Sequence, residues 1–118
     1  MLKLRPEIQI YVSVTPIDMR KSIDGLSALV SQEFNHDPLS GHLFLFFNRS
    51  RDKVKLIYWD RNGYVLHYKR MEKHRFFVPD LTKVNQLIIT EVQLNGLLVG
   101  LNYEIMGDFK EIDYDKIF

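Results

Sequence analysis

Residues 42–71 have the sequence HLFLFFNRSRDKVKLIYWDRNGYVLHYKRM, in which two short polar stretches separate three runs of branched and aromatic residues. Such runs favour strands, and the polar stretches consist of residues that are common in tight turns. The pair Asn62 and Gly63 is among the strongest hairpin signals, because both residues tolerate the positive φ that a two-residue turn requires. The pattern predicts three consecutive antiparallel strands, a β-meander.

A strand and a helix are predicted before the meander. Residues 8–14, IQIYVSV, favour a strand because branched and aromatic side chains dominate them. Thr15 is suited to cap a helix that starts at Pro16, and apolar residues then recur at three- and four-residue steps as far as Phe34. This predicts a helix that begins directly after Thr15.

A second strand and helix pair is predicted after the meander. Residues 86–89, QLII, favour a strand, and Thr90 and Gln93 match the spacing of a capping box. An apolar stripe follows as far as Leu101, and Gly100 is suited to end the helix.

The predicted fold class is α+β, with one domain over residues 1–102. We expect a mostly antiparallel β-meander sheet with two α-helices packed on one face. Alternate residues of segment 53–59 would point into the core, and the opposite face would carry Lys53 and Lys55. Residues 103–118 are predicted to form an acidic tail outside the domain.

Composition excludes several classes of function. The chain has no cysteine, which excludes disulfides, thiolate zinc sites and cysteine nucleophiles, and its glycines match no phosphate-binding motif. No cofactor, metal or small-molecule substrate is therefore predicted. Neither a signal peptide nor a run of roughly 18 apolar residues is present, so we expect a cytoplasmic protein without a membrane partner. His36, Asp37 and His42 follow no metal-ligand spacing, and a solvated loop is the simpler interpretation.

Charge is segregated along the chain. Residues 49–75 contain nine Lys or Arg against three acids, a net charge of +6, whereas residues 102–118 contain five acids against two lysines, a net charge of −3. The basic segment is either a phosphate-binding surface or the solvated face of a sheet. The acidic segment suggests a tail that folds back on the basic surface and masks it.

Three stretches carry a resemblance to a known family: PIDMRKSIDGLSALV at residues 16–30, DPLSGHLFLFFNRSRDKVKLIYWDRNGYVLHYKRMEK at residues 37–73, and RFFVP at residues 75–79. In this order they closely resemble the TnpB accessory proteins of the sixty-six group of bacterial insertion sequences, which are distinct from the larger RNA-guided nuclease of the same name. The chain departs from the family pattern at Ser22, where glycine is usual, and at His67 and Val78, where tryptophan is usual.

The resemblance implies a small protein, encoded beside a transposase, that assists transposition and DNA recombination without being an enzyme. Its expected partners are DNA and the transposase or other element-encoded proteins. The family positions that suit phosphate contacts, and therefore form the predicted DNA-binding residues, are Arg20, Lys21, Arg49, Arg51, Lys55, Lys69 and Arg70. Arg20 and Lys21 would lie within the first turn or two of the first helix, directly after its cap, where the exposed backbone N–H groups also favour anions.

Two alternatives stay open at this point. The protein would otherwise be an interaction module that docks on the transposase or another accessory protein without contacting DNA. A third class is a metal-dependent nuclease that uses Asp18, Asp52 or Asp60, although nothing in their spacing brings these carboxylates together.

Overall fold

The three apolar runs of residues 42–71 form the predicted meander. They are β2 (Leu43–Phe47), β3 (Lys53–Asp60) and β4 (Gly63–Arg70), paired antiparallel in chain order. Asp60 pairs with Gly63, so the hairpin turn consists of Arg61 and Asn62, one residue earlier than predicted. Arg61 adopts the positive φ of this turn, at 51°. The hairpin is confirmed, and its turn is shifted.

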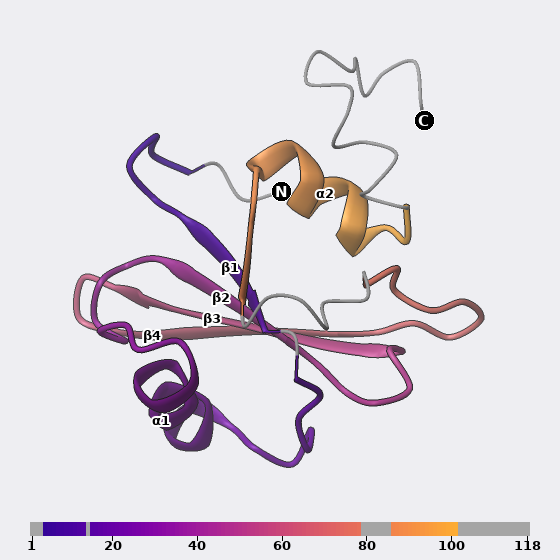
Figure 1. Ribbon diagram of the computed structural model, residues 1–118, viewed down its shortest axis with the longest axis horizontal. Coiled ribbons are helices and arrows are strands. Elements are labelled where there is room, and N and C mark those ends of the chain that lie inside the picture. The colour runs from indigo at the N-terminus through magenta and orange to yellow at the C-terminus, as the bar shows by residue number, and fades with distance from the viewer. Residues whose placement is uncertain (1–3, 14, 79–85, 102–118) are drawn as a thin grey trace.

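Two further strands complete the sheet in this computed structural model, which describes residues 4–13, 15–78 and 86–101 (Figure 1). β1 (Ile10–Ser13) lies parallel to β2, and β5 (Gln86–Ile89) pairs antiparallel with β1. The strand order is therefore β4-β3-β2-β1-β5. A parallel pair needs a crossover connection, and the segment between β1 and β2 supplies it with a helix.

The two helices, α1 (Ile23–Glu33) and α2 (Glu91–Leu98), cover opposite faces of the sheet (Figure 1). The α+β class with a mostly antiparallel sheet is confirmed, but the prediction that both helices pack on one face is wrong. Every residue of β2 is buried, which is typical of a strand covered on both sides. The core on the α1 side consists of Tyr11, Leu26, Val30, Phe34, Phe44, Phe46 and Ile57. The core on the α2 side consists of Ile10, Val12, Leu43, Leu45, Phe47, Val54, Leu56, Phe76, Val78, Ile89, Leu94 and Leu97.

Helix α1 begins later than predicted. Its N-cap is Ser22, so neither Thr15 nor Pro16 belongs to it. The preceding residues form a turn instead, because the Asp18 side chain accepts a hydrogen bond from the backbone N–H of Arg20 at 2.9 Å. Side-chain bonds of this kind offer the backbone an alternative to the helical ladder.

Helix α2 has the ends that its sequence predicts. Thr90 Oγ1 accepts a hydrogen bond from the backbone N–H of Gln93 at 3.1 Å, and Gln93 Oε1 accepts one from the N–H of Thr90 at 2.9 Å. At the other end, the N–H of Leu101 donates to the carbonyl of Gly96 at 2.9 Å, and Gly100 adopts a φ of 89°. The capping box and the glycine terminator are both confirmed.

Residues 103–118, the predicted acidic tail, lie outside the described residues, and the division of the chain at residue 102 stays a prediction. Neither α1 nor α2 is long and apolar enough to cross a membrane, and no other helix occurs in the ranges that the structure describes.

Replacing Gly100 by alanine will destabilise the protein by roughly 1–2 kcal/mol, because a side chain is disfavoured in the left-handed region. The added Cβ would also lie 3.0 Å from Met71 Cε. The matched control is Gly63→Ala, where nothing lies within 4 Å of the new Cβ and φ is not positive. Urea unfolding would measure both variants, and equal midpoints would contradict this role of Gly100.

Candidate nucleic-acid interface

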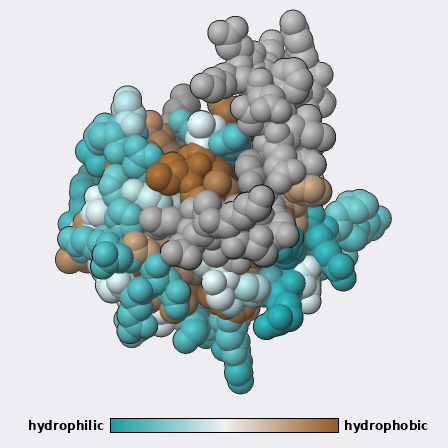
Figure 2. All heavy atoms as spheres, in the orientation of Figure 1, coloured by the Kyte–Doolittle hydropathy of each residue, from teal (hydrophilic) through white to brown (hydrophobic). Residues whose placement is uncertain are grey.

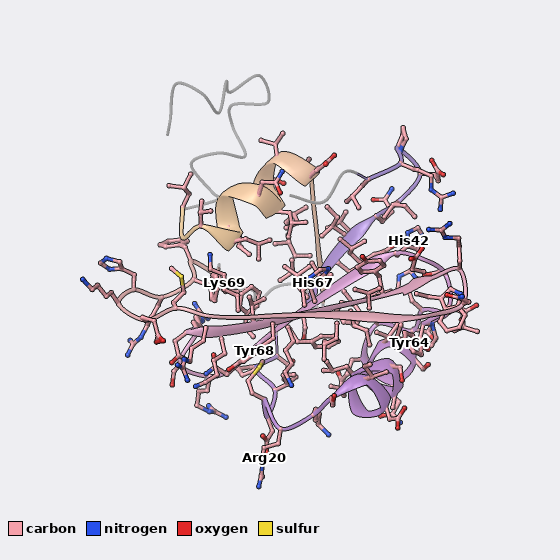
Figure 3. The ribbon with its side chains drawn as sticks, turned by 180° about the vertical axis from the view of Figure 1, so that it is seen from behind. Arg20, His42, Tyr64, His67, Tyr68 and Lys69 are labelled. Carbon is pink, nitrogen blue, oxygen red and sulfur yellow. The ribbon has the colours of Figure 1, made fainter. Side chains whose placement is uncertain are left out.

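The predicted DNA-binding cations of the sheet do not share one face. β4 alternates its side chains, with Tyr64 and Tyr68 on the α1 side and His67 and Lys69 on the α2 side (Figure 3). Arg70 is the residue after Lys69, so it lies on the α1 side with its pairing partner Lys53. The prediction of a single basic sheet face is therefore wrong for Lys69.

Lys55 holds the loop before α1 against the sheet. Its Nζ atom donates to the carbonyl oxygens of Met19 at 2.8 Å and of Lys21 at 2.7 Å, and it lies 5.6 Å from the centre of the Tyr68 ring. An ammonium group with two carbonyl acceptors and an aromatic ring has little capacity left for a phosphate. Lys55 is consequently a tether between two segments.

The side chains of Arg51 and Lys69 also bind backbone carbonyl groups of distant segments. Arg51 Nη1 donates to the carbonyl oxygen of Val78 at 2.6 Å, and Lys69 Nζ donates to the carbonyl oxygen of Leu98 at 2.6 Å. Leu98 is the last residue of α2, where a cation is favoured by the negative end of the helix dipole. Both cations fasten segments that are distant in the sequence.

Two other predicted cations pair with carboxylates while staying exposed. Arg20 Nη2 lies 2.6 Å from Asp18 Oδ2, and its Nε contacts both carboxylate oxygens of Asp18. These hydrogen bonds lower the pKa of Asp18 to about 2. Arg70 Nη2 lies 2.9 Å from Glu72 Oε1. Exposed pairs of this kind exchange partners at little cost.

The surroundings of Arg20 and Lys21 differ from those expected. Both residues lie in the turn before α1, whose N-cap is Ser22, so the predicted placement in the first turns of the helix is wrong. Arg20 projects away from the sheet with 91% of its side chain exposed (Figure 3). Lys21 is also exposed.

Arg49 stands in the turn between β2 and β3. The N–H of Arg51 donates to the carbonyl oxygen of Asn48 at 3.1 Å, and Asn48 Oδ1 accepts from the N–H of Lys53 at 3.0 Å. These bonds fix the turn and leave Arg49 exposed. Within the part of the chain that the structure describes, neither Lys21 nor Arg49 forms an ion pair or a side-chain hydrogen bond.

A second basic loop, absent from the predicted contacts, adjoins this turn. Residues 71–75 protrude beyond the sheet (Figure 1), where Figure 2 shows hydrophilic side chains. The loop is closed at its base, because the N–H of Met71 donates to the carbonyl of Asp52 at 2.6 Å and the N–H of Phe76 donates to that of Arg51 at 2.7 Å. Its exposed residues include Lys73, His74 and Arg75.

These backbone bonds place the two loops side by side and create a local cluster of cations, here called the basic tip. Its members are Arg49, Arg70, Lys73 and Arg75. All four are exposed, and of these only Arg70 has a carboxylate partner in the described ranges, Glu72. The signal in the sequence was the charge run that follows β4 directly and ends at the buried Phe76.

Comparison with known proteins identifies the family of the chain. A family model described as IS66 Orf2 like protein matches residues 8–107. The chain belongs to this family. It is 32% identical to the uncharacterized protein y4jC of Sinorhizobium fredii over 81% of each chain. It is also 30% identical to the uncharacterized protein y4hO of the same organism, over 87% of this chain and 89% of the relative. No solved structure matches it.

Membership of the IS66 Orf2-like family supports a role as an accessory protein of an insertion sequence. Several residues of the motifs that carried the resemblance have structural roles here. Asp18 builds the turn before α1, Asn48 fixes the turn before β3, and Lys55 joins the sheet to the first of these turns. Their polar side chains alone are therefore no evidence of contact with DNA.

The carboxylates considered for a nuclease are not brought together. Asp52 and Asp60 flank β3 at opposite ends, a separation of roughly 25 Å along an extended strand. Asp18 lies elsewhere, in its pair with Arg20. Among the described residues, no group of three or more His, Asp or Glu side chains is placed to hold a metal ion.

His36 and His42 pack around Tyr11 instead of converging on an ion. The His36 ring lies 4.3 Å from the Tyr11 ring, and His42 Nδ1 accepts a hydrogen bond from the backbone N–H of Gln9 at 2.9 Å. Burial lowers the pKa of His42, and the nearby His36 contributes to the shift. The neutral form of His42 is therefore the form that the fold favours.

Replacing Lys55 by methionine will destabilise the fold by about 1.5–3 kcal/mol, because the carbonyls of Met19 and Lys21 lose a charged donor. The matched control is Arg49→Met, which removes an exposed cation and is expected to change stability by less than about 0.5 kcal/mol. Urea unfolding would compare the two variants. An effect of Lys55→Met as small as that of the control would contradict the role of Lys55 in holding the loop before α1 against the sheet.

Stability will fall on acidification because of His42. Its pKa is lower in the folded state than the ordinary value of 6.5, so its contribution is complete above pH 6.5 and is lost as the pH falls through the folded-state value. Thermal unfolding between pH 7.5 and 5 would show this loss. We expect His42→Asn to reduce the dependence and His74→Asn, at an exposed position, to retain it. An unchanged profile in His42→Asn would contradict the assignment.

Proposed function

We propose that this IS66 Orf2-like protein is a non-enzymatic accessory of transposition that binds the DNA of its element through the basic tip. The observation that carries the proposal is the position of Arg49, Lys73 and Arg75 on two adjoining loops at one end of the sheet, with Arg70 at the end of β4 directly before the second loop. Arg20 and Lys21 extend this surface on the α1 side, since Lys55 joins their loop to β3. The cytoplasm, which holds bacterial DNA, is the proposed place of action.

The chemistry of the tip suits a polyanion. Exposed guanidinium and ammonium groups bind phosphate oxygens, and the counterions that they displace from DNA supply much of the free energy. Loop 71–75 projects from the sheet and is closed by two backbone bonds, so it presents its cations without first having to become ordered. Contacts of this type position a protein on DNA without reading its sequence.

Binding will depend steeply on salt. Four phosphate contacts predict a slope of roughly −3.6 for the logarithm of the affinity against the logarithm of the salt concentration. The double variant Arg49→Gln/Arg75→Gln removes two of these contacts and will reduce the slope to roughly −1.8. Fluorescence anisotropy with duplexes of the element's terminal repeats, at several salt concentrations, would measure both slopes.

The matched control is Arg5→Gln/Arg61→Gln. It removes the same charge from exposed arginines that lie beside another groove, lined also by Trp59 and Asp60 at the far end of β3. We expect it to retain a slope near that of the unmodified protein. Equal effects of the two double variants would show that net charge and not the basic tip governs binding, and would contradict the proposal.

A second candidate function is docking on the transposase, which the edge of β4 favours. β4 is the outermost strand on its side of the sheet, and 52% of Tyr68 is exposed. An open edge strand accepts an added strand from a partner. Co-purification with the transposase that survives nuclease treatment, together with absent DNA binding, would favour this function over the first.

A further inference from the structure

An apolar groove lies between β4 and α2, on the side of the sheet opposite α1. It has a volume of about 490 Å³, and its lining includes Val54, Leu56, His67, Lys69, Asn95 and Leu98. α2 contains eight residues, and the core cluster that its buried side chains join includes residues of β1, β2, β3 and β5 but none of β4, so the outer strand is less covered on this side. This incomplete cover leaves the groove open.

We infer that residues 102–118 of the same chain occupy this groove. The first argument is reach. Leu98, which lines the groove, is four residues before Asn102, and α2 has already ended there, with Gly100 at a left-handed φ of 89°. An extended segment of 17 residues spans roughly 55 Å, more than the longest dimension of 38 Å, so any part of the groove is accessible to it.

The second argument is chemical complementarity. Residues 111–115 have the sequence EIDYD, in which acids alternate with Ile112 and Tyr114. In an extended conformation, alternation places the acids on one side and the apolar side chains on the other. The groove has both an apolar part, formed by Val54 and Leu56, and a cation, Lys69. The apolar part suits Ile112 and Tyr114, and the cation suits the acids.

The position of Lys69 strengthens this match. Its Nζ atom donates to the carbonyl of Leu98 at 2.6 Å, which holds the ammonium group at the junction of β4 and α2. Two donor protons remain for other acceptors. A carboxylate from the segment would pair with Lys69 there, while Ile112 and Tyr114 cover Val54 and Leu56. This inference does not depend on DNA binding.

Paired cysteines test the inference directly, since the chain has no cysteine of its own. In the full chain, Asn95→Cys with Ile112→Cys joins the groove to the segment, and the matched control, Ala28→Cys with Ile112→Cys, uses an exposed position of α1 on the opposite side. We expect the groove pair to form an intramolecular disulfide at least about tenfold faster than the control pair, because docking raises the effective concentration.

A charge reversal in the segment provides a second test without altering the folded domain. Adding Asp113→Lys to the groove pair will slow its cross-linking towards the rate of the control, because Lys69 then faces a like charge. Equal rates for the groove and control pairs would overturn the inference. Disulfides that form only between molecules would also overturn it, since a second copy would then supply the occupant.

Discussion

The burial of β2 on both of its faces is the constraint on which the rest of the structure depends. All five residues of this strand, LFLFF, are at most 3% exposed, and each large apolar side chain contributes roughly 1.5–3 kcal/mol when it leaves water. Both faces of the sheet must therefore be covered. The parallel pairing of β1 with β2 supplies α1 to one face, and the segment that follows β5 supplies α2 to the other.

Covering both faces leaves less room for a charged sheet surface, and this explains how the cations of residues 49–75 are used. Lys55 and Lys69 extend from strands under a loop or a helix, where backbone carbonyl oxygens accept hydrogen bonds from their ammonium groups. Arg51 does the same for the segment around Val78. The exposed cations of the basic tip lie instead at the end of the sheet, on two loops and on the last residue of β4, where no core has to be covered. A basic segment in the sequence thus divides into tethers and a basic tip.

Sequence patterns predicted the local elements well, because local chemistry determines them. The hairpin of β3 and β4 and the ends of α2 at Thr90 and Gly100 follow from turn and capping preferences of neighbouring residues. The start of α1 was missed, since Pro16 and Thr15 fit a helix start while the side chain of Asp18 stabilises a competing turn. The placement of the helices on opposite faces was missed because the tertiary arrangement, and not local preference, determines it.

The candidate site was predicted less completely, for a physical reason. The exposure of Lys55 and of Arg49 depends on which segments pack above each strand and loop. Local sequence patterns do not show this tertiary packing. The charge count indicated residues 49–75 as a region of interest, and the resemblance to the family proposed positions within it, but neither separated residues that build loops from residues that present charge. Lys73 and Arg75 were overlooked, although they follow β4 in an exposed loop.

The central claim is that the basic tip, and not the sheet face, contacts DNA. Chemical-shift mapping of backbone amides, during titration with a duplex of the element's terminal repeat at low salt, tests it most directly. The account predicts that shifts concentrate in residues 48–51 and 71–75, with smaller changes at residues 20–21. Shifts concentrated in the Arg61 turn or around Lys69, with residues 71–75 unaffected, would contradict it.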